Sequence, residues 1–327
     1  MEPERLLSAL ADGRAHSGEE LARALGVTRA AVWKRMSRLA EWGLDVVAVP
    51  GVGYRLKRPL DLVEPAVLQA ALADRVAAPL IEIEVLTEID STNRRLVDRP
   101  PPPGSANVCL AEFQRSGRGR RGRAWHAPLG GGLCLSVGWQ FADMPADLAA
   151  LTLAVGVVVR RALARVTGVD VALKWPNDLV WDGRKLGGIL LELAAEAQGG
   201  CHVVAGIGLN VSMPAELLTA ICDWPRGAVD LATAMGRAPP PRGALAVEIV
   251  AAVVELFAAY PEVGFAAYRN DWRDADFLKG RRIRLESTAG TVAGTALGIE
   301  IDGALIVETE AGVRERIISG DVSVRGD

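Results

Sequence analysis

The pattern of hydrophobic and polar positions divides the 327-residue chain into three parts. In the first 58 residues apolar positions recur at helical spacing, as in Val32, Met36 and Leu39, and a short alternating stretch follows. The long middle part mixes apolar strands with apolar helices. After Trp272, apolar and polar residues alternate at period two in short segments separated by glycine-containing turns, which predicts a small antiparallel β-barrel.

The first part predicts a winged helix-turn-helix fold. Ser17 and Glu20 form a capping box that opens one short helix, and Thr28 caps a second helix with the sequence TRAAVWKRMSRLAEWG. The segments LDVVAV and YRL flank the turn Pro50-Gly51-Val52-Gly53, and this arrangement predicts a β-hairpin. Two short helices followed by a hairpin are typical of a DNA-binding head, whose second helix enters the major groove.

Charge supports this interpretation. Seven basic and two acidic residues lie between Thr28 and Arg58, a net charge of 7 − 2 = +5 in a chain whose formal net charge is −3. Local positive charge of this kind is needed to bind DNA phosphates, although a winged helix used for protein contact is the alternative. The predicted DNA-binding residues are Thr28, Arg29, Lys34, Arg35 and Arg38.

The middle part contains a hairpin and a long apolar helix. Asp182-Gly183 is a strong turn sequence, so Lys174 to Trp181 and Arg184 to Ala194 are predicted to be two antiparallel strands. The helix predicted from Ala146 to Val166 is apolar on nearly all sides, which places it against the back of a sheet.

The stretch from Gln114 to Leu133, QRSGRGRRGRAWHAPLGGGL, concentrates arginine and glycine. Glycines allow backbone amides to approach a phosphate closely, and arginines bind its oxygens through two parallel hydrogen bonds. We therefore expect a mobile, cationic loop that binds a nucleotide or another polyanion. An arginine-glycine segment for nucleic acid, or a solvated linker, is the alternative.

Polar residues also interrupt the predicted hairpin strands. Lys174, Asn177, Asp178 and Lys185 stand among leucine, valine, isoleucine and tryptophan. A buried ammonium group needs an anionic partner. Glycines after Lys185 let a backbone approach a ligand, so that partner could be a bound phosphate; a surface lysine in a hairpin is the alternative.

A further predicted strand, HVVAGIGLNV, contains two glycines that reduce its side-chain volume. Gly206 and Gly208 leave room for a flat ring, and Asn210 can hydrogen-bond the edge of that ring. Glycines placed only for close packing of the strand are the alternative.

Several classes of protein are excluded by missing motifs. The chain has no GxxxxGK[ST] phosphate loop, no GxGxxG between a strand and a helix, no HExxH and no nucleophile elbow. Its four cysteines (Cys109, Cys134, Cys201 and Cys222) form no CxxC pair and are interpreted as buried and reduced, and its three histidines form no metal-spaced cluster.

The N-terminal sequence and the hydropathy of the chain indicate where in the cell the protein is found. The start MEPERLLSAL carries acidic residues where a signal peptide needs basic ones, and the longest apolar helix is expected near Leu148 to Val159, short of the ~20 residues that span a bilayer. We expect a cytoplasmic protein that does not contact a membrane.

Six motifs, taken in order, resemble bacterial biotin protein ligases of the bifunctional class, which also act as biotin operon repressors. They are STN (Ser91 to Asn93), GRGRRGRAW (Gly117 to Trp125), KWPNDL (Lys174 to Leu179), GRKLGGIL (Gly183 to Leu190), GIGLNV (Gly206 to Val211) and SGDVSVR (Ser319 to Arg325). HSGEELARALGVTRAAVWKRM and PGVGYRL likewise resemble the repressor's winged helix. The resemblance runs nearly end to end.

This resemblance implies a reaction in two steps. The carboxylate of biotin attacks the α-phosphate of ATP, which is bound with Mg²⁺, to give biotinyl-5′-adenylate and pyrophosphate. A lysine amine of an acceptor protein then attacks the mixed anhydride. Fixed cations suit the first step, because negative charge spreads over the equatorial phosphate oxygens in its transition state.

The family motifs also imply a role for individual residues. The implied catalytic residues are Lys185 and Arg120. The implied biotin-binding residues are Ser91, Thr92, Asn93, Gln114, Gly117, Arg118, Arg120, Lys185 and Gly188. The implied ATP- and adenylate-binding residues are Arg118, Arg120, Arg121, Trp125, Lys185, Asn210 and Trp224. Asp178 would orient the acceptor lysine, Arg123 would help to steer polyphosphate, and the protein itself would provide no metal site.

The fold class implied is α+β with three domains and a linker. The domains are a winged helix-turn-helix domain (1–58), a central class II synthetase-like ligase domain with a mixed sheet (81–272) and a C-terminal SH3-like β-barrel (273–327), and a linker and helix (59–80) join the first two.

The implied partners are the biotin carboxyl carrier protein of acetyl-CoA carboxylase, biotin operator DNA, and a second copy in a homodimer induced by biotinyl-5′-AMP. Three alternatives stay open: a ligase whose winged helix no longer represses, a lipoate or octanoyl ligase on the same fold, and a ligand-sensing regulator with a degenerate catalytic domain.

Overall fold

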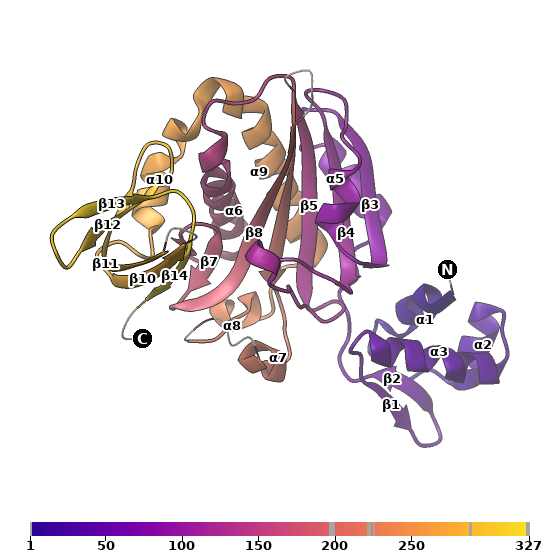
Figure 1. The fold of residues 1–327 in the computed structure, drawn as a ribbon. Coiled ribbons are helices and arrows are strands. Elements are labelled where there is room, and N and C mark those ends of the chain that lie inside the picture. Colours follow the sequence, from indigo (N-terminus) through magenta and orange to yellow (C-terminus); the bar gives the residue numbers. More distant parts are fainter. Residues whose placement is uncertain (1, 196–199, 221–223, 225, 288–289, 325–327) are drawn as a thin grey trace.

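A computed structural model describes residues 2–195, 200–220, 224, 226–287 and 290–324 (Figure 1). A small N-terminal head and a C-terminal sheet flank a larger central part built on one sheet. The three-part fold predicted from the sequence is confirmed by this architecture.

The head contains three helices and one hairpin. Their bounds are α1 (Glu2–Leu10), α2 (Gly18–Leu25), α3 (Arg29–Glu41), β1 (Val46–Val49) and β2 (Gly53–Leu56). Ser17 and Glu20 form the predicted capping box, and the side chain of Thr28 accepts a hydrogen bond from the backbone nitrogen of Ala31 at 3.2 Å. The predicted helix starts and the wing are therefore confirmed.

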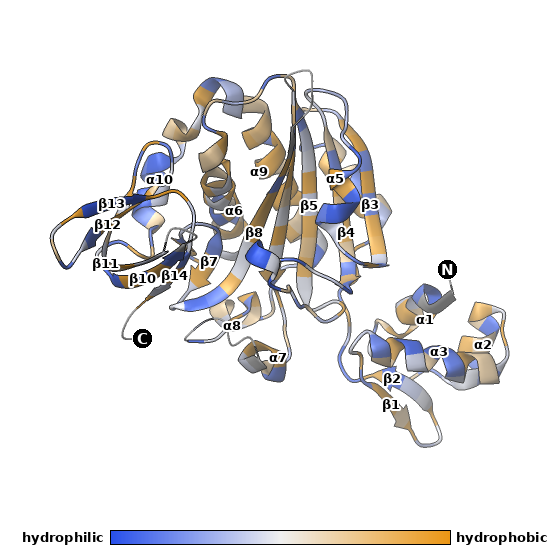
Figure 2. Cartoon of the chain, in the orientation of Figure 1, coloured by the Kyte–Doolittle hydropathy of each residue, from blue (hydrophilic) through white to orange (hydrophobic). Residues whose placement is uncertain are grey.

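The central sheet has seven strands in the order β3-β4-β5-β9-β8-β7-β6. Their bounds are β3 (Leu80–Ile89), β4 (Ala106–Gln114), β5 (Gly132–Phe141), β6 (Ala172–Lys174), β7 (Asp178–Trp181), β8 (Arg184–Ala195) and β9 (Cys201–Asn210). Strands β3 and β4 are parallel, whereas the other neighbours are antiparallel. Figure 2 shows β3, β4 and β5 as largely hydrophobic strands.

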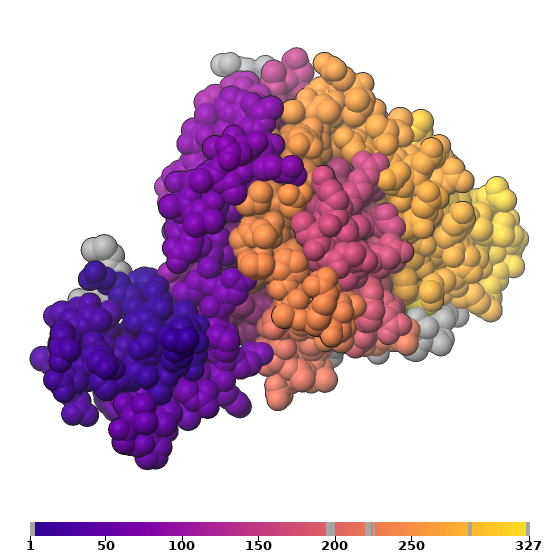
Figure 3. Space-filling view, turned by 180° about the vertical axis from the view of Figure 1, so that it is seen from behind, coloured from indigo at the N-terminus to yellow at the C-terminus, as the bar shows by residue number. Residues whose placement is uncertain are grey.

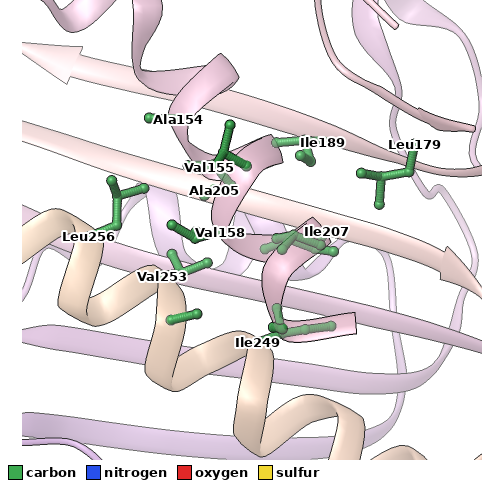
Figure 4. Packing of buried hydrophobic residues seen from close by; sticks show 14 of the residues in the cluster. Ala154, Val155, Val158, Leu179, Ile189, Ala205, Ile207, Ile249, Val253 and Leu256 are labelled. Atoms are coloured by element: carbon green, nitrogen blue, oxygen red, sulfur yellow. The ribbon is translucent and has the colours of Figure 1, made fainter. Parts of the chain in front are cut away.

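Most helices of the central part contact its sheet. Their bounds are α4 (Pro65–Ala73), α5 (Thr92–Val97), α6 (Leu151–Thr167), α7 (Ala215–Ala220), α8 (Leu231–Met235), α9 (Arg242–Val263) and α10 (Arg269–Ala275). Short 3₁₀ turns occupy Arg120–Gly122 (η1), Leu148–Ala150 (η2) and Phe265–Ala267 (η3). Figure 4 shows side chains of α6 and α9 packed against residues of β8 and β9. The predicted placement of the apolar helix against the sheet is thus confirmed, and α5 covers part of the other face.

A buried ion pair fixes the segment that joins the head to the central part. Arg242 and Glu112 are 1% and 5% exposed and contact one another. Arg242 also donates from Nε to the carbonyl oxygen of Asp61 at 2.9 Å, and Glu112 accepts from the backbone nitrogen of Val63 at 2.8 Å. Because each buried charge has several partners, the linker is held against the start of α9 and against β4.

The C-terminal sheet is antiparallel, in the order β13-β12-β11-β10-β14. The strand bounds are β10 (Arg282–Ser287), β11 (Gly290–Ile299), β12 (Leu305–Thr309), β13 (Arg314–Ile317) and β14 (Asp321–Val324). Its buried residues, among them Leu285 and Val307, belong to the same hydrophobic cluster as the central part. The head has a separate cluster, which Leu129 of the central part also joins.

Two predicted elements need correction. The stretch Lys174 to Trp181 is not one strand but two, β6 and β7, which pair with one another across a turn containing a cis Trp175-Pro176 bond. Proline has no N–H for the ladder, so the strand ends there. The apolar helix begins at Leu151 and not at Ala146, because Leu148–Ala150 form a 3₁₀ turn first.

The expectation for the longest apolar helix was also wrong. Helix α9 has 22 residues and is apolar enough to cross a membrane by length and composition. Most of its apolar window, 61%, is buried inside the protein. A buried helix of this kind is typical of a core element.

Candidate active site

A cavity of about 270 Å³ lies between the central sheet, the arginine-glycine loop and the C-terminal sheet. Most of the predicted site residues line it. Those that do are Ser91, Thr92, Asn93, Gln114, Arg118, Arg120, Trp125, Asp178, Lys185, Gly188 and Trp224. Gly117, Arg121 and Asn210 are not among its lining residues.

One end of the cavity is a buried polar network at the start of α5. Ser91 caps this helix, and Thr92 donates from its backbone nitrogen to Oε1 of Gln114 at 2.8 Å. The hydroxyl oxygen of Ser136 on β5 lies 2.7 Å from Oγ1 of Thr92 and 2.6 Å from Oδ1 of Asn93. Since buried polar groups rotate little once they are hydrogen-bonded, this end presents fixed donors and acceptors to a polar ligand.

The hairpin β7–β8 carries a lysine and a carboxylate to the other end. Nζ of Lys185 lies 2.8 Å from Oδ1 of Asp178, and the side chains are 20% and 14% exposed. A Cβ added at Gly188 would lie 3.5 Å from the same carboxylate, so this glycine leaves space beside the pair. The anionic partner that the sequence required for Lys185 is therefore a protein carboxylate in this structure.

Lys174 points into the same space without an ion pair among the residues that the structure describes. Its Nζ lies 3.8 Å from the centre of the Trp224 ring, and the residue is 7% exposed. Burial lowers the pKa of Lys174 to about 8, which the nearby charge of Asp178 opposes only in part. Trp224 is fixed in turn, because its Nε1 donates to the carbonyl oxygen of Gly183 at 2.8 Å.

The arginines of the loop face acidic groups. Arg118 lies 3.1 Å from Oε1 of Glu192, and Arg121 lies 3.1 Å from Oδ2 of Asp321, which Arg123 also contacts. Burial alone would raise the pKa of Asp321, but the adjacent Arg123 and Arg121 lower it. The loop thus lies against the C-terminal sheet through charge pairs.

Arg120 is held differently from its neighbours. Its Nη1 donates to the carbonyl oxygen of Gly320 at 3.3 Å, and burial lowers the pKa of its guanidinium group. Within the described part of the chain this is the one hydrogen bond of the Arg120 side chain, so the desolvated guanidinium keeps most of its donors for an anion in the cavity.

The glycines of β9 leave room for a flat ring, as the sequence predicted. In the structure this ring is a side chain of the protein itself, Trp125. A Cβ added at Gly208 would lie 2.5 Å from the ring of Trp125, and one at Gly206 would lie 2.0 Å from Oδ1 of Asn93. Asn210 is fully buried and donates to the carbonyl oxygen of Val229 at 3.0 Å. It supports the segment behind the cavity wall.

Three contributors were absent from the predicted site. Ser136, Glu192 and Asp321 make the contacts described above with Asn93, Arg118 and Arg121. Ser136 was visible as the one hydroxyl residue in the apolar strand GLCLSVGWQF, and Asp321 stood inside the SGDVSVR motif. Their partners are distant in sequence, so no spacing rule identified them.

The cysteines are structural where the structure describes them. Cys109, Cys134 and Cys201 are buried, and burial raises the pKa of Cys109 to about 12 and that of Cys134 to about 11. Thiols that stay protonated are poor nucleophiles. Cys222 lies outside the described residues. Within the described ranges, no group of three or more histidine, cysteine or acidic side chains could hold a metal ion.

In the head, the predicted DNA-binding residues lie at the start and along the surface of α3. Arg38 contacts Oε2 of Glu41 at 2.7 Å and Oε2 of Glu88, on β3 of the central part, at 2.9 Å. Glu88 also contacts Arg115, the first arginine of the loop, at 2.7 Å. Arg115 chiefly lowers the pKa of Glu88, to about 2, and Arg38 adds to this effect.

Comparison with known proteins agrees with this architecture. Models of three families match the chain: the HTH domain at residues 4–55, the Biotin/lipoate A/B protein ligase family at 85–210 and the Biotin protein ligase C terminal domain at 279–325.

Full-length relatives and a solved structure are similar as well. The bifunctional ligase/repressor BirA of Salmonella typhimurium is 36% identical over 99% of this chain and 97% of its own length, and that of Escherichia coli is 35% identical with the same coverage. The biotin protein ligase from Aquifex aeolicus in complex with biotin and ATP is 27% identical, with a TM-score of 0.59 over 75% of this chain and 98% of that one. The chain belongs to the biotin protein ligase family, in the bifunctional branch that combines the ligase with an N-terminal repressor head.

Proposed function

We propose that this biotin protein ligase joins biotin to AMP in the 270 Å³ cavity and then transfers the biotinyl group to a lysine of a biotin carboxyl carrier protein. One observation supports the location above all others. The cavity places the polar network around Thr92 and the cations Lys185 and Arg120 in a single space. A ligand with a polar uncharged head and a phosphate-bearing tail fits that distribution.

The biotin end would be the network at the start of α5. Ser91, Thr92, Asn93 and Gln114 supply hydroxyl and amide groups to the ureido ring, and Ser136 holds two of them in place. A ureido group has both donors and a carbonyl acceptor, so a site of fixed amides and hydroxyls favours it over an aliphatic acid.

The phosphate end would be Lys185 with Arg120, and with Arg118 and Arg121 steering the polyphosphate. In the first step a carboxylate oxygen of biotin bonds to the α-phosphorus while the bond to the pyrophosphate oxygen breaks. Lys185 and Arg120 stabilise the charge on the equatorial oxygens of that transition state. Mg²⁺ would enter with ATP, whose phosphates supply its oxygen ligands.

Asp178 would serve the second step. The acceptor amine attacks the acyl carbon, the bond to the AMP oxygen breaks, and the amine loses a proton. Asp178, which lies 2.8 Å from Lys185, is placed to orient the amine once Lys185 contacts phosphate.

The adenine end of the site would be formed or supported by Trp125, Trp224 and Asn210.

We further propose that the adenylate controls transcription. The ordered loop would let two copies dimerise, and the dimer would present two winged helices to a palindromic operator. The contact of Glu88 with both Arg115 and Arg38 supports a link between loop and head.

We also propose the domain limits 1–58, 59–80, 81–272 and 273–327, and a cytoplasmic location for the protein.

A transfer assay tests the catalytic proposal. The protein is incubated with ATP and with biotin, lipoate or octanoate, and the acyl-adenylate is detected by mass. Label transfer from biotin to a biotin carboxyl carrier domain is then measured. We expect adenylate and transfer with biotin alone. A lipoyl- or octanoyl-adenylate would favour the other acid, and no transfer of biotin would favour a degenerate regulator.

Protection of an upstream operator tests the repressor. Binding should need both biotin and ATP, because only the adenylate orders the loop. Equally weak binding with and without them would leave a ligase whose head no longer represses.

A further inference from the structure

The exposed face of α3 carries a large aromatic ring. Trp33 is 70% exposed, and Ala30, Lys34 and Ser37 lie on the same face at helical spacing. The opposite face buries the stripe of Val32, Met36 and Leu39 in the core of the head. The helix is therefore already packed without Trp33.

A second tryptophan in the same segment shows what a structural role would require. Trp42, the residue that follows α3, is 1% exposed and belongs to the hydrophobic cluster of the head, whereas Trp33 does not. An indole left in water contributes no burial energy to the fold. Tryptophan is enriched at the cores of binding interfaces, so the exposed indole of Trp33 is available for contact with a partner.

The surroundings of Trp33 are cationic. Arg29 lies one turn before it on the exposed side of α3, and Lys34 follows it directly. Across the described ranges of the chain, neither of these two residues has an ion pair. With the excess of positive charge between Thr28 and Arg58, this surface fits a polyanion.

The shape of the head decides which polyanion fits. Figure 3 shows the head as a lobe that protrudes from the rest of the molecule, and Figure 1 places α3 and the β1–β2 wing together in it. A protruding helix with a wing matches the groove of duplex DNA, and residues near the N-terminus of such a helix contact base edges. Trp33 lies in the second turn of α3, which begins at Arg29.

We propose that Trp33 helps to determine the DNA sequence recognised by the head, by packing its indole ring on the 5-methyl group of a thymine in the major groove. This inference rests on the proposed DNA binding. Thymine is the one base that presents an apolar group there, and an indole face has no charge that would bind phosphate instead. Arg29 and Lys34 position the helix on the backbone.

The experiment removes that methyl group. Duplexes that bind the wild-type protein with biotin and ATP are selected from a random library, and each thymidine of the selected site is replaced in turn by deoxyuridine. At one thymine position of each half-site, we expect deoxyuridine to lower the affinity of the wild-type protein about fourfold. This is the effect of no longer burying one methyl group. The Trp33→Ala variant should bind the thymidine and deoxyuridine duplexes equally, and Trp33→Phe should retain part of the difference.

Val52→Ala is the matched control, because Val52 is an exposed apolar residue at the tip of the wing, 52% exposed. It should keep the full thymidine preference. Circular dichroism confirms that Trp33→Ala is folded, as expected for an exposed position.

Three outcomes would overturn the inference. Trp33→Ala could keep the preference for thymidine, or it could change self-association and leave the preference intact, which would make Trp33 a protein contact. If the wild-type protein enriches no duplex at all, the proposed DNA binding fails, and the role of Trp33 fails with it. In the first two cases the DNA binding itself would stand.

Discussion

Two basic regions of the molecule hold their charges in opposite ways. In the arginine-glycine loop, Arg118, Arg121 and Arg123 each lie against a carboxylate of the same protein. On α3, Arg29 and Lys34 extend into solvent with no ion pair among the residues described. Both regions are proposed to bind phosphate.

The difference follows from the size of the ligand and from solvent. Cations that surround a small ligand in a partly enclosed cavity are costly to desolvate, so protein acids pair with some of them, Arg118 and Arg123, and can be exchanged for phosphate. Cations that bind a long duplex stay hydrated, and the release of counterions from the DNA drives binding. The two regions meet at Glu88, which contacts one arginine from each.

The largest expected effect is in the cavity. Lys185→Ala should lower the rate of adenylate formation by about 10²–10³, because it removes a fixed cation from the α-phosphate. Biotin- and ATP-dependent release of pyrophosphate measures it. Lys279→Ala, at an exposed lysine, is the control. Wild-type rates in Lys185→Ala would disprove the role of this lysine.

On the head the effect should be smaller and depend on salt. Lys34→Ala should weaken binding to any duplex by about tenfold at low salt and reduce the slope of log affinity against log salt by about 1. Fluorescence anisotropy over a range of salt concentrations measures both. Lys57→Ala, which removes a wing lysine 3.6 Å from Asp45, should change the slope less. Equal slopes for Lys34→Ala and wild type would contradict the comparison.

Lys174 should give the cavity a pH dependence. Its pKa of about 8 means that the charged form predominates below pH 8 and is lost above it. Affinity for ATP should therefore fall about fivefold between pH 7 and pH 9, as one cation disappears. Lys174→Met should bind more weakly at pH 7 and lack this change. Calorimetry measures the affinity, and an unaltered pH profile in the variant would assign the titration to another group.

The smallest effect should come from Glu88→Gln, at the meeting point of the two regions. The pKa of Glu88 is lowered from 4.5 to about 2, so its stabilising contribution is present above pH 4.5 and is lost as the pH falls toward 2. Urea unfolding should show a loss of about 0.5 kcal/mol for the variant at neutral pH, and this loss should fade as the pH falls through 2. Glu41→Gln, which removes a more exposed partner of Arg38, is the control. A loss independent of pH would point to packing instead.

Local chemistry made much of the fold predictable. The capping box at Ser17, the cap at Thr28 and the Asp182-Gly183 hairpin depend on neighbours within a few residues, and the structure has all three. The family motifs then named residues most of which line the cavity, because each motif is a short continuous segment; Gly117, Arg121 and Asn210 are the exceptions.

Long-range contacts were not predictable. Asp321 contacts Arg121 of the loop from a strand 200 residues later, and Ser136 on β5 contacts Thr92 at the start of α5, 44 residues earlier. Asn210 sits in a motif, but its burial behind the cavity wall depends on the packing of Val229. Contacts between side chains so far apart in the sequence depend on how the whole chain packs. That packing cannot be read from a single sequence.

The separate hydrophobic cluster of the head has a consequence for the history of the gene. Because the C-terminal sheet shares its core with the central part, a mutation that deleted it would expose the interior of the enzyme. A deletion of residues 1–58 would uncover apolar side chains that pack against the head, namely Leu60, Leu62, Phe113 and Leu129. A few polar substitutions at these positions would restore a soluble surface, so this lineage can lose its regulator in a small number of steps and keep the enzyme.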